Sequence, residues 1–238
     1  MTAVGAKPVG IEPSELTLNI NSKNIEKYIN KKTKACIAVH LYGQPADLDE
    51  ILKITKSHNL YLIEDAAQAH GAEYKGQSIG CHGDVVCWSF YPGKNLGAFG
   101  DAGAVTTNKK DLAEKISILR NYGSSKKYKN DYLGINSRID PIHASVLNVK
   151  LRHLENWNKR RNKLALEYFK NIKNPLVSKP YILPYVYSSF HLFVIQSNQR
   201  DKLKHFLEKN RIETIIHYPI PPYKQNCYKY LRYNENSF

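Results

Sequence analysis

The sequence of 238 residues lacks several patterns that mark other classes of protein. It has no stretch of about 18 apolar residues, so we expect no membrane-spanning helix. Its four cysteines form no C-x-x-C pair and stand at no zinc-binding spacing with histidine, so we expect no metal site and free thiols in a reducing compartment. The first residues also lack a basic segment followed by an apolar one, as a secretion signal would have. We therefore expect a cytoplasmic protein.

Long runs of like charge are absent as well, although the formal net charge is +14 and the pI is about 9.5. Such a charge favours an anionic partner: nucleic acid, a membrane surface or a phosphorylated metabolite. The lysines are scattered among Asn, Ile and Tyr, and the basic triplet 159–161 falls in a helical pattern, so no binding patch stands out. We expect an anionic metabolite as partner, and neither nucleic acid nor a membrane.

Strand and helix patterns alternate through the first half of the chain. Near-continuous apolar runs predict strands at 35–41, 60–63, 84–90 and 103–107. Apolar residues on one helical face predict helices at 21–29, 45–58 and 110–121. This alternation predicts an α/β domain with a mainly parallel sheet, which we place at 1–140.

The composition changes after residue 121. Residues 121–140 predict a polar loop longer than an ordinary connection, and such loops often have a function. The next helical pattern predicts one long inter-domain helix at 141–172. Three prolines follow, and residues 192–196, 202–207 and 212–217 then predict a strand, a helix and a strand. We therefore expect a smaller C-terminal domain at 173–238.

Two segments carry residue types suited to cofactor chemistry. Asp65 comes at the end of an apolar strand, where open α/β sheets bind ligands. Farther on, a strand ends near Ser89 and a Pro-Gly turn precedes Lys94, which would hold that lysine on a defined backbone, as Schiff-base chemistry requires. Each segment taken alone has a plainer interpretation. The acid can cap the next helix, and the lysine can be a solvated turn residue.

Taken together, these segments resemble the DegT/DnrJ/EryC1/StrS family of sugar aminotransferases. The matching motifs are V-H-L-Y-G-Q-P at 39–45, E-D-A-A-Q-A-H-G at 64–71, S-F-Y-P-G-K-N at 89–95, G-D-A-G-A-V at 100–105, R-N-Y-G-S at 120–124 and N-S-R-I-D at 136–140. The resemblance spans nearly the whole chain. It implies pyridoxal 5'-phosphate as cofactor and the aspartate-aminotransferase-like fold (fold type I), with an α/β large domain and part of a small α/β domain.

The resemblance assigns roles residue by residue. Lys94 matches the catalytic lysine that binds the cofactor and moves the proton during transfer. Asp65 matches the carboxylate paired with the pyridine nitrogen, and Gln68 the residue beside the ring hydroxyl. Ser89 matches a phosphate contact. Asn136 matches a residue that reaches the cofactor phosphate of the neighbouring subunit, which implies a homodimer with shared sites.

The substrate side is implied less directly. His40, Tyr42, His70 and His217 are candidate substrate neighbours, and a structural role for His70 is an equal alternative. The segment I-H-Y-P-I-P-P at 216–222 resembles relatives that act on dTDP-3-oxo-6-deoxyhexoses, although it is also typical of a structural corner. The implied reaction aminates a nucleotide-linked keto-deoxysugar, with glutamate or glutamine as donor, for O-antigen, lipopolysaccharide or other glycan biosynthesis.

The match to the family has gaps. Family members carry an N-terminal stretch with a phosphate-binding loop and an aromatic residue that stacks on the cofactor, and this chain shows no counterpart. Its end also comes before the last helices of the small domain, so we expect both domains to be incomplete. Two alternatives stay open: an inactive, truncated remnant, and a pyridoxal-phosphate-dependent sugar dehydratase. In the dehydratases the lysine is commonly replaced by histidine, so Lys94 argues against them.

Overall fold

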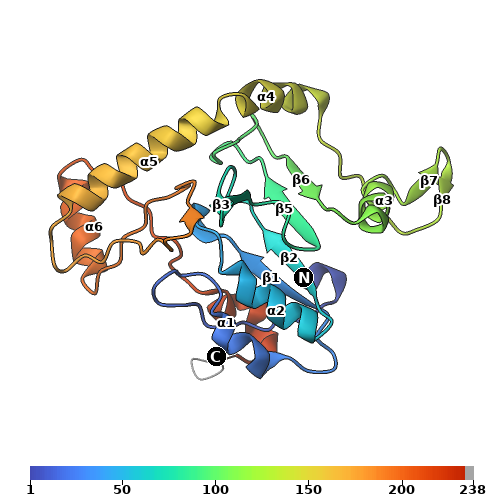
Figure 1. The fold of residues 1–238 in the computed structure, drawn as a ribbon, viewed down its shortest axis with the longest axis horizontal. Helices are drawn as coiled ribbons and strands as arrows, with labels where there is room; N and C mark the ends of the chain where they lie inside the picture. Colours follow the sequence, from blue (N-terminus) through green and yellow to red (C-terminus); the bar gives the residue numbers. More distant parts are fainter. Residues whose placement is uncertain (234–238) are drawn as a thin grey trace.

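The computed structural model describes residues 1–233, and its centre is a four-stranded sheet of order β1-β2-β5-β6 (Figure 1). The strands are β1 (Ala35–Val39), β2 (Tyr61–Asp65), β5 (Val85–Ser89) and β6 (Gly103–Thr106). Neighbours β1, β2 and β5 are parallel, and β6 is antiparallel to β5. The prediction of a mainly parallel sheet is therefore confirmed. The parallel register brings the carboxyl ends of β2 and β5 to one edge of the sheet.

The main core lies between this sheet and helix α2 (Leu48–Ser57). Alternate strand residues face inward because side chains along a strand point to opposite faces, so Leu62 and Val86 are buried. Leu48 and Ile51 of α2 pack against them and are 0% exposed. Each such side chain stabilises the fold by about 1.5–3 kcal/mol.

Further helices precede and follow the strands of the sheet. Helix α1 (Ser22–Ile25) begins where the Asn21 side chain accepts a hydrogen bond from the backbone N–H of Lys23 at 3.2 Å, as an N-cap does. Helix α3 (Lys110–Leu119) follows β6. The 3-10 helices are η1 (Thr2–Val4), η2 (Glu26–Tyr28), η3 (Leu41–Gly43), η4 (Pro222–Lys224) and η5 (Asn226–Leu231).

The segment predicted as a polar loop contains a small hairpin. Strands β7 (Ser124–Lys126) and β8 (Lys129–Asn130) pair within it, and the hairpin projects beyond α3 at the side of the molecule away from α5 (Figure 1).

The predicted long inter-domain helix is two helices, α4 (Pro141–Leu151) and α5 (Leu154–Asn171), with a change of direction between them (Figure 1). Leu147 of α4 and Leu154 of α5 both enter a second small core with Leu96 and Ala98. No proline or glycine marks the junction, and the apolar pattern runs through it. The prediction was wrong here because the break depends on packing against the segment around Leu96, which the helical pattern does not contain.

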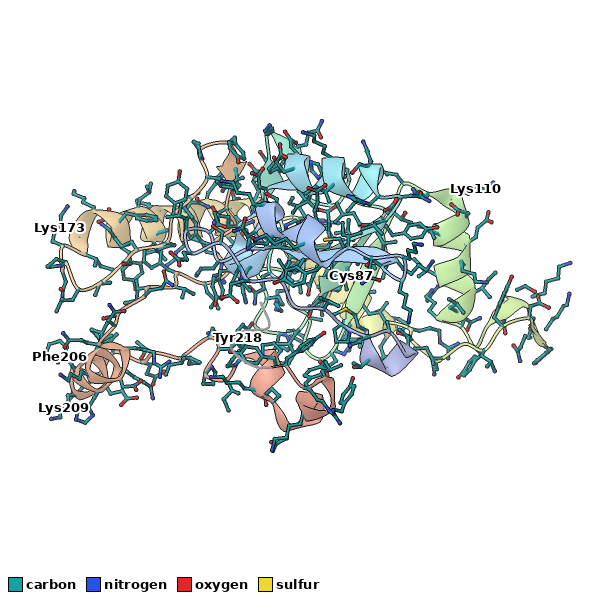
Figure 2. The ribbon with its side chains drawn as sticks, turned by 90° about the horizontal axis from the view of Figure 1, so that it is seen from below. Cys87, Lys110, Lys173, Phe206, Lys209 and Tyr218 are labelled. Carbon is teal, nitrogen blue, oxygen red and sulfur yellow. The ribbon has the colours of Figure 1, made fainter. Side chains whose placement is uncertain are left out.

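The part after α5 joins the large domain through a three-stranded sheet of order β4-β3-β9. Its strands are β3 (Glu73–Tyr74), β4 (Gln77–Ser78) and β9 (Val186–Tyr187). Helix α6 (Arg200–Lys209) corresponds to the helix predicted at 202–207 and stands apart from the main body, where Figure 2 labels Phe206 and Lys209. Within residues 1–233, no helix has the length and apolar character needed to cross a membrane.

The strands predicted at 192–196 and 212–217 are wrong. In the first, only Gln196 makes an isolated bridge, to Ser178, and residues 212–217 form no strand. An apolar run becomes a strand only where a neighbouring segment offers backbone donors and acceptors in register. Residues 234–238 of the predicted small domain lie outside the described residues.

Candidate active site

Lys94 stands in a closed turn that follows β5. The backbone N–H of Lys94 donates to the carbonyl of Tyr91 at 2.9 Å, and that of Ala98 donates to the carbonyl of Phe90 at 2.7 Å. These bonds fold residues 90–98 back on themselves. The backbone that carries Lys94 is therefore defined, as the sequence predicted from its Pro-Gly turn.

Gly97 has no room for a side chain in this turn. A Cβ atom at Gly97 would lie 2.4 Å from the carbonyl oxygen of Pro92. We expect Gly97→Ala to displace the turn and lower the free energy of unfolding by about 1–3 kcal/mol, measured by urea denaturation. Gly93→Ala is the matched control, because its Cβ would meet only the Tyr91 ring, at 3.9 Å. Equal losses in both variants would contradict this account.

Asp65 and Lys94 influence each other electrostatically. Asp65 ends β2, and its Oδ1 accepts a hydrogen bond from the backbone N–H of Ala67 at 3.0 Å. Lys94 is partly buried, and burial lowers the pKa of its amine, while the negative charge of Asp65 acts in the opposite direction. A desolvated amine is more often neutral and therefore more nucleophilic. The structure thus places a reactive amine near a carboxylate at the sheet edge where ligands bind in such folds.

Gln68 links three segments that are distant in the sequence. Its buried side-chain Oε1 accepts from the backbone N–H of Tyr42 at 2.6 Å, and its Nε2 lies 3.4 Å from the hydroxyl of Tyr218. These contacts orient the amide. The hydroxyl of Tyr42 donates to the carbonyl oxygen of His217 at 2.8 Å, and burial, with a smaller contribution from Tyr218, raises the Tyr42 pKa. The structure therefore brings together Tyr42, Gln68 and His217. Sequence analysis missed Tyr218, although it lies in the same motif as His217.

His40 was expected beside the substrate, and the structure corrects this. The side chain is 0% exposed, and its Nε2 lies 2.8 Å from Oε2 of Glu64, which is also 0% exposed. The Nδ1 of His40 accepts from the backbone N–H of Ala46 at 3.0 Å, so the ring proton is on Nε2. Both ring nitrogens of His40 form hydrogen bonds within the protein. His40 therefore connects the end of β1 to Glu64 of β2 in the buried interior.

His70 is also a packed residue. It is 3% exposed, with its ring centroid 5.3 Å from that of Trp88 and 5.7 Å from that of Phe90. Burial, and then the positive charge of Lys94, lower the pKa of His70 to about 4. This environment matches the structural alternative left open by the sequence and leaves little of the ring for a substrate to contact.

Ser89 and Asn136, the two residues predicted to contact the cofactor phosphate, lie in different parts of the structure. Ser89 ends β5, and its Oγ accepts from the backbone N–H of Tyr91 at 3.3 Å, so its hydroxyl is next to the Lys94 turn. Asn136 is exposed and forms a bridge with Asn121. Among the described residues, no hydrogen bond joins Asn136 to Lys94. The role predicted for Asn136 involves a second subunit and stays a prediction.

The chemistry of these groups fits pyridoxal phosphate. The amine of Lys94 suits an aldehyde, the carboxylate of Asp65 suits a protonated ring nitrogen, and the hydroxyl of Ser89 suits a phosphate oxygen. The amide of Gln68 has its oxygen directed at the Tyr42 N–H, and its NH₂ group, 3.4 Å from the Tyr218 hydroxyl, has a second N–H for a ring oxygen. Within residues 1–233, no group of three His, Cys, Asp or Glu side chains could hold a metal ion.

Comparison with known proteins decides the family. Residues 1–238 match the model of the DegT/DnrJ/EryC1/StrS aminotransferase family. This chain belongs to that family. It is 47% identical over 228 residues to the dTDP-3-amino-3,6-dideoxy-alpha-D-galactopyranose transaminase of Aneurinibacillus thermoaerophilus, covering 96% of this chain and 63% of the relative. It is 44% identical over 229 residues to the dTDP-3-amino-3,4,6-trideoxy-alpha-D-glucose transaminase of Streptomyces venezuelae, covering 96% of this chain and 60% of the relative.

Solved structures of family members have the same fold. DesV of Streptomyces venezuelae, crystallised in complex with a ketimine intermediate, has a TM-score of 0.96 at 44% identity, over 99% of this chain and 64% of that chain. An aminotransferase of the same family from Brucella abortus has a TM-score of 0.91 at 34% identity, over 96% and 63%. The predicted fold type I and the predicted cofactor are those of the family. The chain spans between 60% and 64% of the length of these relatives.

Proposed function

We propose that this chain carries the catalytic lysine of a pyridoxal-phosphate-dependent aminotransferase that converts a dTDP-linked 3-oxo-6-deoxyhexose to the 3-amino sugar. The main supporting observation is that Asp65, at the end of β2, acts electrostatically on Lys94 in the turn after β5, while burial lowers the pKa of the lysine amine. Two relatives at 47% and 44% identity, both named as dTDP-3-amino-sugar transaminases, support the substrate class. The amino donor in this proposal is glutamate or glutamine.

Each site residue has a task in this reaction. When bound, pyridoxal phosphate supplies an electron sink for the carbon that exchanges its proton. Lys94 would hold the cofactor covalently, and its amine, once freed, would take up and return that proton. Asp65 would keep the ring nitrogen protonated. The NH₂ group of Gln68 and the hydroxyl of Ser89 would bind oxygen atoms of the ring and of the phosphate.

Tyr42, His217 and Tyr218 would form the substrate side of the site, because they meet beside Gln68. The net charge of +14 suits a nucleotide diphosphate. The same proposal includes a cytoplasmic homodimer with shared sites, in which Asn136 reaches the second subunit, and a role in O-antigen, lipopolysaccharide or other glycan biosynthesis. Sedimentation of the cofactor-loaded protein tests the dimer.

The first test is the visible absorbance of the purified chain mixed with pyridoxal phosphate. We expect the band of a lysine-bound cofactor, which borohydride then fixes onto the peptide that contains Lys94, as mass spectrometry would show. A spectrum identical to that of free cofactor, with no fixed label, would refute cofactor binding by this chain. It would favour the alternative of a catalytically inactive remnant. A dehydratase is not favoured, because the lysine is present.

We expect Asp65→Asn to reduce transamination about 100-fold, because the amide cannot keep the ring nitrogen protonated. The substitution preserves side-chain size and the acceptor for the N–H of Ala67, so the free energy of unfolding should change by less than about 1 kcal/mol. Steady-state kinetics and urea denaturation measure the two effects. If the loss of stability accounted for the loss of activity, Asp65 would be structural.

A further inference from the structure

His191 lies beside the candidate site and was not predicted from the sequence. Its Nδ1 is 3.2 Å from Oδ1 of Asn95, the residue that follows Lys94 in the chain. Ser189, two residues before His191 and 0% exposed, donates from its Oγ to the carbonyl oxygen of Gln68 at 3.2 Å. The chain around His191 is therefore attached both to the lysine turn and to the segment of Gln68.

The contacts of Asn95 determine which nitrogen of His191 carries the proton. Asn95 is 5% exposed, and its Nδ2 donates to Oδ1 of Asn158 at 2.9 Å and to the carbonyl oxygen of Ser189 at 2.8 Å. Both amide hydrogens are thus used, and the oxygen of Asn95 faces His191. Asn158 is itself held, because its Nδ2 donates to the carbonyl oxygen of His70 at 2.8 Å. An amide oxygen only accepts, so the Nδ1 of His191 must be N–H.

His191 is also uncharged at neutral pH. The charged and titratable groups that act on it are Lys94, Arg161, His70 and His217, and none of them is a carboxylate. Burial, and then the positive charges of Lys94 and Arg161, lower the pKa of His191 to about 4. The neutral ring with its proton on Nδ1 has a lone pair on Nε2. Among the described residues, no hydrogen bond reaches that Nε2.

We propose that His191 is a further substrate-contacting residue, whose Nε2 accepts a hydrogen bond from a hydroxyl group of the sugar at Lys94. This inference rests on the proposed function. An unprotonated Nε2 can accept a hydrogen bond only from a group that carries an O–H or N–H. Phosphate oxygens and the keto oxygen of the substrate carry none at neutral pH, whereas the remaining sugar hydroxyls do. His191 would therefore contribute to recognition of the sugar and not of the diphosphate.

The first arm of the test uses the ligand-free protein. Nitrogen NMR of protein labelled on histidine is expected to show His191 with its proton on Nδ1, remaining neutral as the pH falls to about 4. A His191→Phe variant assigns the signal. A proton on Nε2, or titration at the ordinary histidine value of 6.5, would overturn the inference whatever the fate of the proposed function.

The second arm uses variants that separate the two ring nitrogens. His191→Asn keeps an N–H donor for Asn95 and lacks the distal acceptor, whereas His191→Gln places an amide oxygen near the position of Nε2. The probes are the dTDP-linked 3-amino-3,6-dideoxyhexose and dTDP alone, titrated calorimetrically into cofactor-loaded protein. We expect His191→Asn to bind the sugar probe about tenfold more weakly and dTDP unchanged, with a smaller loss in His191→Gln.

Sugar binding by His191→Asn at the wild-type affinity would overturn the contact. So would a wild-type protein that loads the cofactor and binds dTDP alone as tightly as the sugar probe. Failure of the wild type to load cofactor at Lys94 is a different result, because it refutes the proposed function itself, and the tautomer of His191 is measured independently of it.

Discussion

Replacement of Lys94 by alanine is expected to abolish covalent binding of pyridoxal phosphate and to lower transamination by at least about 10⁴-fold. The amine is the group that would hold the cofactor and move the proton, and the Asp65 carboxylate, which acts on it electrostatically, cannot substitute for it. Borohydride fixation followed by peptide mass spectrometry measures the first effect, and single-turnover kinetics the second. Residual turnover near the wild-type level would refute the site assignment.

Lys110→Ala is the control for this experiment, because the side chain of Lys110 is 91% exposed and its ion pair with Glu114 is long, at 3.9 Å. It should leave both cofactor fixation and turnover unchanged. Unfolding of Lys94→Ala should differ from wild type by less than about 1 kcal/mol, because the change removes a partly buried charge and opens no cavity in the main core. A large loss of stability would make its inactivity uninformative.

Replacement of His40 by alanine is expected to cause the largest loss of stability, about 3–5 kcal/mol. His40 and Glu64 are both fully buried, and removal of the imidazole leaves the carboxylate in the core with the backbone N–H of Gly83 as its remaining partner. Urea denaturation measures the loss. The matched control is His58→Ala, because His58 pairs with Glu26 at 3.2 Å while both side chains are exposed. That variant should lose at most about 1 kcal/mol.

The same pair predicts how stability depends on pH. Burial alone would raise the pKa of Glu64, but the hydrogen bonds from the His40 ring and from the N–H of Gly83 together lower it below 4.5. A carboxylate with a lowered pKa in the folded state stabilises the fold above the unfolded value, and this contribution disappears as the pH falls through the folded value. Wild-type stability should therefore drop below pH 4.5 more steeply than that of Glu64→Gln. Parallel curves would show that the pair is unimportant.

The sequence by itself was sufficient for the sheet and the central chemistry. Runs rich in apolar residues predict strands, which is why β1, β2 and β5 could be located without the structure, although at most alternate residues of each strand are buried. Lys94 and Asp65 could be selected because the motifs around them, taken together, resemble one family, whereas each local pattern alone had a plainer interpretation. The parallel pairing of β2 and β5 then places Asp65 and the turn that carries Lys94 at the same edge of the sheet.

Only the tertiary structure decided which polar residues face the site and which are buried. His40 and His191 both follow apolar residues in the chain. The neighbouring sequence does not show that the first is buried in contact with Glu64, or that the second forms a hydrogen bond with Asn95. These contacts join residues 24 and 96 positions apart. The break between α4 and α5 also depends on a core that several segments build together. A local sequence pattern indicates backbone preference and burial. Hydrogen-bond partners, and helix ends that depend on packing, are determined only when the distant segments of the chain come together in the fold.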